Sequence, residues 1–191
     1  MTTADIRLFH GAELLAHTTG LRSVYRDAFG APPWNEGEKE EAQFLERLAV
    51  DVRRPGFTAV TAEQDGEVVG FATAWTTPAP FPTDRCYPQA AAGLGPDRTV
   101  QWLCGARQVD ELAVRSAARG SGLGADLLQA VTGDAPEGRA WLLTSVRASR
   151  AMAFYRRQGW TQATHPSPDG TGITVFLGPR HPARTLAALP L

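Results

Sequence analysis

The sequence has little of what marks nucleic-acid-binding and membrane proteins. Lys39 is the single lysine among 19 basic residues, and 20 acidic residues bring the formal net charge to -1. A chain without excess positive charge has no electrostatic footprint for nucleic acid or for an anionic membrane surface. Its apolar runs fall short of the ~20 residues that a membrane span needs. We therefore expect no nucleic acid and no membrane among its partners.

Cysteine and histidine are also scarce. Cys86 and Cys104 cannot form a structural zinc site alone, and their spacing matches neither C-x-x-C nor a C/H finger. The N-terminus "MTTADIRLFHG" lacks the basic start and apolar core of a signal peptide. We expect a reduced, cytoplasmic protein, and the arginine-, alanine-, glycine- and proline-rich composition is typical of a bacterial source. We expect no metal site, since no two histidines have ligand spacing, and surface or loop positions for His10, His17, His165 and His181.

The composition that remains is that of an ordinary globular protein. The chain has 191 residues, of which 43% are hydrophobic and 20% are charged. A chain of this length can bury a core without disulfides or metals. We expect one domain over residues 1–178, followed by a dispensable tail over 179–191.

Hydrophobic periodicity predicts a chain in which strands and helices are mixed. The firmest prediction is a β-hairpin around Asp65-Gly66, because this dipeptide accepts the positive φ angles of a tight turn. Several prolines interrupt residues 78–104, where we expect at most a short helix. The other predicted strands cover 4–9, 107–114, 139–146, 160–165 and 172–178, and the predicted helices cover 11–29, 44–52, 123–133 and 149–158.

The stretch "ARGSGLGADLL", residues 118–128, places three glycines at alternate positions between a predicted strand and a predicted helix. Gly120-x-Gly122-x-x-Ala125 satisfies a permissive dinucleotide fingerprint, in which backbone N–H groups hold a pyrophosphate. The next strand, however, ends in threonine and serine rather than in an acid for ribose hydroxyls, and too little chain follows for a doubly wound domain. The absence of Gly-Lys-Ser/Thr excludes a Walker-type loop. A turn with only a structural role remains the alternative.

The flanks of this turn carry a longer pattern. In "DELAVRSAARGSGLGADLL", Arg119, Gly122 and Gly124 follow a strand that ends in valine. This arrangement resembles the Gln/Arg-x-x-Gly-x-Gly/Ala signature of the acetyl-CoA site in the GNAT N-acetyltransferase superfamily. The resemblance implies that consecutive backbone amides of the turn bind the CoA pyrophosphate.

A second motif follows further along the chain. In "ASRAMAFYRRQGW", Ala151, Tyr155, Gly159 and Trp160 fall on positions of the family's Asn-x-x-Ala-x-x-x-Tyr-x-x-x-Gly-Phe helix. The sequence departs from the family at the asparagine, which is replaced by Ala148. Two motifs in the family's order are more specific than either motif alone.

The resemblance implies a fold, an activity and a set of binding residues. The fold is α/β, or α+β by some schemes: three layers, with a mixed, mostly antiparallel central sheet and helices on both faces. The activity is direct transfer of an acetyl group from acetyl-CoA to a primary amine in a ternary complex, and a homodimer is one expected assembly. Acetyl-CoA would be bound by Leu112, Ala113, Val114, Arg119, Gly120, Ser121, Gly122, Leu123, Gly124, Ser149 and Tyr155. Ser149 is also expected to cap its helix in place of the missing asparagine.

Acetyl transfer requires a base, because an amine with a pKa of about 10 is almost fully protonated at pH 7. Asp110 and Glu111 lie on the strand whose end should face the thioester, and alternation lets only one of them point into the site. We favour Glu111. The alternative is that both are ordinary exposed carboxylates or pair with Arg115.

The remaining catalytic roles follow from the resemblance. The backbone N–H of Val114 would stabilise the thioester oxyanion, and the hydroxyl of Tyr155 would protonate the departing thiolate. Core packing is the alternative for Tyr155, and a nucleophilic Cys104 is a competing mechanism. A non-catalytic acyl-CoA-binding module is the alternative function.

The acceptor side should be walled by the two N-terminal helices, their "PPWNE" connection and residues 78–104. Aromatic residues there could form an amine-binding surface or belong to the core: Trp34, Phe81, Tyr87 and Trp102. The sequence leaves both a small-molecule amine and a peptide or protein amine as acceptors.

Overall fold

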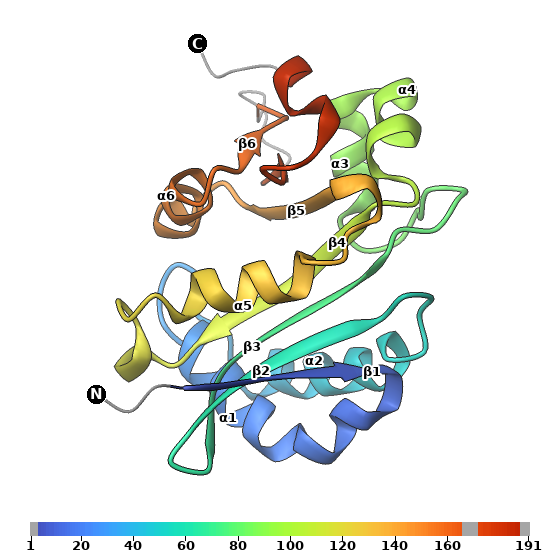
Figure 1. Cartoon of the computed structure of the whole chain (residues 1–191). Helices are drawn as coiled ribbons and strands as arrows, with labels where there is room; N and C mark the ends of the chain where they lie inside the picture. Colours follow the sequence, from blue (N-terminus) through green and yellow to red (C-terminus); the bar gives the residue numbers. More distant parts are fainter. Residues whose placement is uncertain (1–3, 166–171, 188–191) are drawn as a thin grey trace. The chain divides into compact units, whose positions relative to one another are not determined.

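The computed structural model describes residues 4–165 and 172–187, and within them it has a mixed α/β fold with seven strands and six α-helices (Figure 1). The strands are β1 (Asp5–His10), β2 (Thr58–Gln64), β3 (Glu67–Thr76), β4 (Arg107–Val114), β5 (Ala140–Ser145), β6 (Thr161–Gln162) and β7 (Ile173–Leu177). The α-helices are α1 (Thr18–Phe29), α2 (Glu38–Asp51), α3 (Tyr87–Leu94), α4 (Pro96–Arg98), α5 (Leu123–Thr132) and α6 (Ser149–Arg157). Shorter helical segments are η1 (Gly11–His17), η2 (Thr99–Leu103), η3 (Ser116–Ala118), η4 (Pro136–Gly138) and η5 (Pro182–Leu186).

The strands form one sheet in the order β1-β2-β3-β4-β5-β7-β6. The pairs β1/β2, β2/β3, β5/β7 and β6/β7 are antiparallel, whereas β4 and β5 are parallel. This topology confirms the predicted mixed, mostly antiparallel sheet. The described chain divides into two compact units, Met1–Trp75 with Asp110–Gly133, and Thr76–Val109 with Asp134–Leu191. We refer to them as unit 1 and unit 2.

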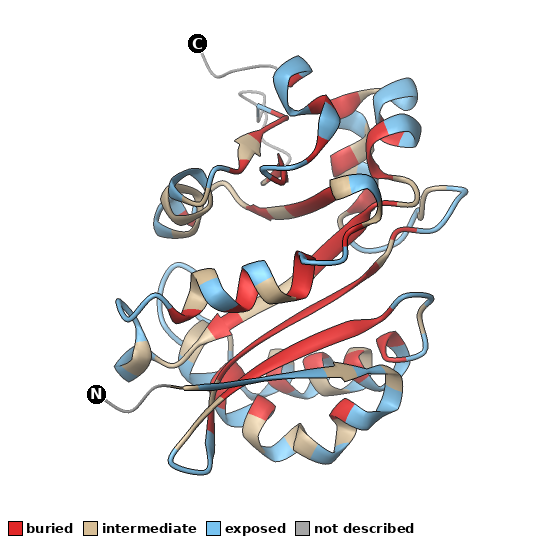
Figure 2. Cartoon of the chain, in the orientation of Figure 1, coloured by how far each residue is buried: buried red, intermediate tan, exposed pale blue. Residues whose placement is uncertain are grey.

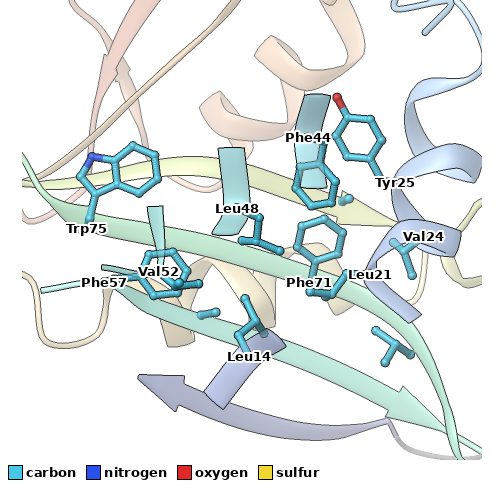
Figure 3. Close-up of a cluster of buried hydrophobic side chains, with 13 residues drawn as sticks. Leu14, Leu21, Val24, Tyr25, Phe44, Leu48, Val52, Phe57, Phe71 and Trp75 are labelled. Atoms are coloured by element: carbon cyan, nitrogen blue, oxygen red, sulfur yellow. The ribbon is translucent and has the colours of Figure 1, made fainter. Parts of the chain in front are cut away.

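Unit 1 packs helices on both faces of its strands. On one face, α1 and α2 bury an apolar stripe against Phe71 of β3 and Ala113 of β4 (Figure 3). The neighbouring Gly70 faces the other way, where a Cβ would come within 2.9 Å of the Leu127 side chain on α5. Because successive residues of a strand point to opposite faces, this pair places α5 opposite α1 and α2. Glycine at position 70 lets α5 approach the sheet closely.

The β2–β3 hairpin has the predicted turn. Asp65 and Gly66 adopt φ angles of 52° and 81°, the left-handed region that a tight two-residue hairpin turn requires. On the other side of β2, β1 is an edge strand whose residues are mostly exposed, in contrast to the buried central strands (Figure 2). Arg7 and Asp5 place charges on this edge, which discourages pairing with another chain.

Unit 2 is more helical than the sequence predicts. Residues 78–104 contain α3, α4 and η2 rather than at most a short helix. The prediction treated the prolines as helix breakers, but Pro88 and Pro96 lie in the first turns of α3 and α4. Proline is tolerated there because those N–H groups have no intrahelical acceptor.

The C-terminal residues of unit 2 also differ from the expected dispensable tail. His181 is 1% exposed, and Ala183 and Ala187 belong to the hydrophobic core of unit 2. His181 accepts a hydrogen bond from the Ala183 amide and caps η5, and its other ring nitrogen lies 2.9 Å from the Trp102 carbonyl oxygen. Of the predicted surface or loop positions, His181 therefore occupies a loop, where it is a buried structural residue. No helix among residues 4–165 and 172–187 is both long and apolar enough to cross a membrane.

Candidate active site

The glycine turn links the end of β4 to the start of α5 within unit 1. Gly120 and Gly122 have φ angles of 82° and 91°, which other residues adopt only with strain. A Cβ at either glycine would meet no other heavy atom within 4 Å, so both face open space. Gly122 is the N-cap residue of α5 and carries no side-chain cap. The turn therefore presents bare backbone to any ligand that approaches.

The start of α5 adds hydrogen-bond donors to this surface. The amides of Ala125 and Asp126 donate to the Gly122 carbonyl, so the hydrogen bonds of the helix begin at Ala125. The amides from Gly120 to Gly124 precede these bonds and lie at the positive end of the helix dipole. Open glycines and amides at a helix N-terminus fit a pyrophosphate group. The predicted turn residues Arg119, Gly120, Ser121, Gly122, Leu123 and Gly124 are thus brought together in one segment.

The side chains of the turn serve its conformation. Arg119 donates to the carbonyl oxygens of Val114 and Ala28, each at 3.3 Å, and Ser121 donates to the Ala118 carbonyl at 2.8 Å. Ala113, upstream of the turn, is buried in the core of unit 1, so only its backbone could contribute to ligand binding. Arg119 therefore ties the turn to the end of β4 and to α1 through hydrogen bonds.

A hollow of about 210 Å³, counting the part open to solvent, lies between α2, β3 and β4 of unit 1. We call it the acidic hollow. Three of its lining residues are carboxylates and one is an arginine. The lining comprises Phe44, Arg47, Leu48, Asp51, Phe57, Thr73, Trp75, Asp110 and Glu111. Figure 3 shows its apolar members, Phe44, Leu48, Phe57 and Trp75, within the core of unit 1.

Both predicted candidates for the base contribute to this hollow, although alternation predicted only one. The Glu111 side chain is 17% exposed, and its Oε1 lies 3.7 Å from Nη2 of Arg47. The Glu111 amide donates to the Thr73 hydroxyl at 3.3 Å. Arg115, the partner considered for an ordinary surface ion pair, donates to the Val68 carbonyl. Glu111 therefore lies in a recess with a cation at its side.

Three residues that the sequence analysis did not identify form a polar cluster beside the acidic hollow: Arg47 and Tyr25, which interact with Glu111, and Glu36, which bonds Tyr25. Tyr25 stacks on Phe44 and donates a short hydrogen bond to Glu36. Burial, the Glu111 charge and the hydrogen bond to Glu36 together raise the pKa of Tyr25, which stays neutral at physiological pH. Arg47 offsets this in part through a hydrogen bond to the same tyrosine. Arg47, Tyr25 and Glu36 come from three different segments, so no local spacing could reveal their meeting.

In unit 2, the second motif forms α6 as predicted. Tyr155 is half-buried, with its ring 5.7 Å from Phe176 and 6.1 Å from Trp160 between centroids. The expected cap is wrong: Ala148 is the N-cap of α6, Ser149 is the first helical residue, and no side-chain capping bond forms. The packing explains the aromatic positions of the motif, whereas the acid role of Tyr155 stays a prediction.

Cys104, the alternative nucleophile, and three of the four candidate acceptor-side aromatics lie in unit 2. Burial raises the pKa of the Cys104 thiol, with a smaller opposing effect from Arg139, and a raised pKa disfavours the thiolate needed for nucleophilic attack. Tyr87 and Trp102 are core residues, and Phe81 packs against that core. In unit 1, Trp34 packs edge-on against Phe29. Among residues 4–165 and 172–187, no three His, Cys, Asp or Glu side chains group closely enough to hold a metal ion.

A strand, an open glycine turn and a helix N-terminus form the arrangement that anion sites of α/β proteins commonly use. The sequence model of the Acetyltransferase (GNAT) family matches residues 19–160, most of the chain. The chain therefore belongs to the GNAT family. A sequence search of curated proteins gives no significant match.

Solved structures from several organisms share the fold. A protein from Corynebacterium glutamicum, described as histone acetyltransferase HPA2 and related acetyltransferase, has a TM-score of 0.61 at 21% identity, covering 98% of each chain. An acetyltransferase from Thermus thermophilus has a TM-score of 0.60 at 17% identity, covering 93% of this chain and 98% of that one. The PaiA N-acetyltransferase from Thermoplasma acidophilum, in complex with coenzyme A, has a TM-score of 0.57 at 12% identity, covering 91% and 98%.

Proposed function

We propose that the protein is an N-acetyltransferase that moves an acetyl group from acetyl-CoA directly to a primary amine in a ternary complex. The observation that carries this proposal is the arrangement of β4. This one strand brings Glu111 into the acidic hollow and ends at the open glycine turn. A single element of unit 1 thus supplies both a candidate base and an entry to a candidate pyrophosphate site.

The turn residues 119–124 would hold the pyrophosphate through their amides. The backbone of Leu112, Ala113 and Val114 would run along the pantetheine arm, as the family resemblance implies. Ser149 and Tyr155 are assigned to acetyl-CoA by the second motif alone. Acetyl-CoA is a co-substrate in this proposal and supplies the activated acyl group.

In the reaction, the Glu111 carboxylate takes a proton from the acceptor ammonium, and the neutral amine nitrogen attacks the thioester carbonyl carbon. The Val114 N–H donates to the oxygen on which negative charge develops. The carbon–sulfur bond breaks, Tyr155 gives its phenolic proton to the leaving sulfur, and the nitrogen loses its second proton as the amide forms. That proton restores the Tyr155 hydroxyl through solvent, so the net release is the one proton taken by Glu111. Arg47 Nη2 lies 3.7 Å from Glu111 Oε1, so a cation stands beside the proposed base.

The acidic hollow would receive the amine end of the acceptor. Its three carboxylates exceed the lining Arg47 together with Arg54, which pairs with Asp51 at 2.6 Å, so a small negative excess favours a cation over an anion. Its enclosed space is about 10 Å³, room for no more than one water-sized group, so it would hold only the amine group of the acceptor. The rest of a small amine, or of a peptide or protein, would remain outside.

The test combines binding and turnover. Calorimetry should detect binding of CoA and acetyl-CoA, and free thiol should appear with acetyl-CoA and at least one amine of a panel that includes peptide amines. Glu111→Gln should lower kcat by about 10²–10⁴, the usual contribution of a general base, and flatten the acidic limb of the pH profile. Asp110→Asn is the matched control. Equal losses in both variants would contradict the assignment of Glu111.

Tyr155→Phe tests the acid separately. It should lower kcat at saturating acetyl-CoA while leaving the Kd for CoA within a fewfold of wild type. Full kcat in this variant would overturn the acid role. Binding of acetyl-CoA without thiol release on any amine would favour the non-catalytic module, and no heat with CoA or acetyl-CoA would remove both functions.

A further inference from the structure

The exposed residue Asp27 of α1 holds the segment that follows β4. Its Oδ1 accepts a hydrogen bond from the Ser116 hydroxyl at 3.0 Å, and its Oδ2 accepts a short bond from the Ser116 amide. Ser116 is the first residue of η3, two positions after the last residue of β4. One carboxylate from a helix distant in sequence therefore fixes both donors of a residue at the entry to the glycine turn.

Two arginines extend this attachment. Arg115 donates to the Ser23 hydroxyl of α1 at 3.0 Å, and Arg119 donates to the Ala28 carbonyl at 3.3 Å. Residues 115–119 are thus joined to α1 at three points between Ser23 and Ala28. We call this set of contacts the α1 latch: Ser23, Asp27 and Ala28 on one side, and Arg115, Ser116 and Arg119 on the other.

The charge of Asp27 is unfavourable for the proposed ligand. A carboxylate near the entrance to a pyrophosphate site repels the phosphates, because like charges destabilise one another. Both carboxylate oxygens, however, are engaged by donors of Ser116. An effect through geometry and an effect through charge would therefore change CoA binding in opposite directions.

We propose that Asp27 is a positioning residue for the cofactor turn, which acts through Ser116 and holds the turn so that its amides converge on the pyrophosphate. This inference rests on the proposed function. The latch can fix the turn because it bonds the turn directly to a rigid helix, whereas the turn itself is built from glycines that have many alternative conformations.

Asp27→Asn is the decisive variant. Asparagine keeps one acceptor oxygen for the Ser116 amide, and its N–H₂ group can donate to the Ser116 hydroxyl, so both bonds lose the charge that strengthens them. If Asp27 positions the turn, KM for acetyl-CoA should rise by about three- to tenfold, the difference between charged and neutral hydrogen bonds, with kcat at saturation unchanged. If Asp27 acts only through its charge, KM for acetyl-CoA should fall in the variant. The difference in KM between variant and wild type should then disappear as the salt concentration is raised from about 0.05 to 0.5 M.

A truncated donor separates the cofactor turn from the rest of the site. S-acetylpantetheine lacks the pyrophosphate, so its kcat/KM should be the same in Asp27→Asn and wild type. A merely structural role would impair both donors, which would overturn the proposal. Ser116→Pro removes the amide donor and the hydroxyl at a position where proline suits the start of a helical turn, and it should reproduce the rise in KM for acetyl-CoA.

A double mutant completes the design. Asp27→Asn combined with Ser116→Pro should be no worse than the more impaired single variant, because both changes remove the same interaction. Asp65→Asn, in the β2–β3 turn, is the control for loss of an acidic residue and should leave KM unchanged. An unaltered KM in Asp27→Asn would overturn the latch while leaving the proposed function intact. Absence of turnover in the wild type would instead contradict the proposed function.

Discussion

At the scale of single residues, the conformation of the glycine turn matters more than its composition. Gly120 and Gly122 are both left-handed and both face open space, whereas Gly124 lies inside the first turn of α5. A side chain at position 122 would therefore impose strain and would also project into the space where we place the pyrophosphate. The effect of backbone strain and the effect of blocking the pyrophosphate can be separated with a control glycine that has similar strain.

Gly122→Ala should raise the Kd for CoA at least tenfold. Left-handed backbone costs a non-glycine residue about 1–2 kcal/mol, and the added methyl group also protrudes from the turn. Gly66→Ala is the matched control, because Gly66 has a φ of 81° and an equally open Cβ position in the hairpin turn. It should show a comparable loss of stability in thermal melts and no change in the Kd from calorimetry. An equal Kd in both variants would contradict the placement of the pyrophosphate.

The sequence predicts which residues form the turn but not which residues surround Glu111. The glycine pattern is local, so it can be read from consecutive letters. Arg47 and Tyr25 meet Glu111, and Glu36 meets Tyr25, only through tertiary packing, and no spacing rule joins them. The capping prediction for Ser149 failed for a different reason: a serine beside a helix start does not specify whether it precedes or opens the helix.

At the scale of secondary-structure elements, α1 and α2 are tied by one buried carboxylate. Glu41 of α2 is 2% exposed and accepts hydrogen bonds from Arg26 at 2.6 and 2.9 Å and a shorter one from Arg22, both on α1. These bonds, led by those from Arg26, lower the pKa of Glu41 from 4.5 to about 2. The helix α2, which lines the acidic hollow, is thus held to α1 partly by a titratable contact.

Glu41→Gln should lower the free energy of unfolding by about 1 kcal/mol at pH 7, because exposed arginines limit the strength of the pair. The folded-state pKa is depressed, so the stabilising contribution is present above about pH 4.5 and is lost as the pH falls toward 2. Denaturant unfolding of the variant and the wild type should therefore converge near pH 2. Glu46→Gln, an exposed change on the same helix, should match the wild type throughout. A gap that persists at low pH would contradict the linkage.

The C-terminal segment makes a second prediction at this scale. Ending the chain after Pro179 removes His181, Ala183 and Ala187 from the core of unit 2, and we expect a loss of about 2 kcal/mol or more. Leu186→Ala is the control, since Leu186 is 67% exposed and should have little effect. Thermal melts decide between a structural and a dispensable segment. A truncated chain that melts like the wild type would restore the dispensable tail.

Periodicity predicted most elements because amphipathic strands and helices repeat over several residues. The strand over 107–114, the hairpin at Asp65-Gly66 and the helix that starts at Leu123 are all found at their expected positions. The errors come from interpreting a residue type without regard to its position in an element. Prolines in residues 78–104 were treated as breakers although two of them open helices. The boundary between domain and tail at residue 178 was drawn from composition, and composition gives no information on whether His181 is buried.

At the scale of the whole molecule, the proposed ligand should stabilise the native state by mass action. A ligand that binds only the folded chain adds about 2.7 kcal/mol at a concentration of one hundred times its Kd. For a protein of this length, we expect CoA to raise Tm by about 5–10 °C at that concentration. Gly122→Ala at the same CoA concentration should show a much smaller shift, and pantetheine should also shift Tm less. A Tm that does not respond to CoA would contradict the cofactor assignment.

Both compact units are assembled from two separated stretches of chain, and this has a consequence for synthesis. Unit 1 is complete only when residues 110–133 join the first 75 residues, and the early stretch of unit 2 must wait for residues beyond 134. During translation, apolar residues such as Trp102 and Leu103 therefore emerge well before Val175 and Leu177, with which they share a core. Late completion of this core leaves nascent chains open to aggregation. Slower elongation, lower temperature or chaperone supply should raise the soluble yield more effectively than changes to the surface.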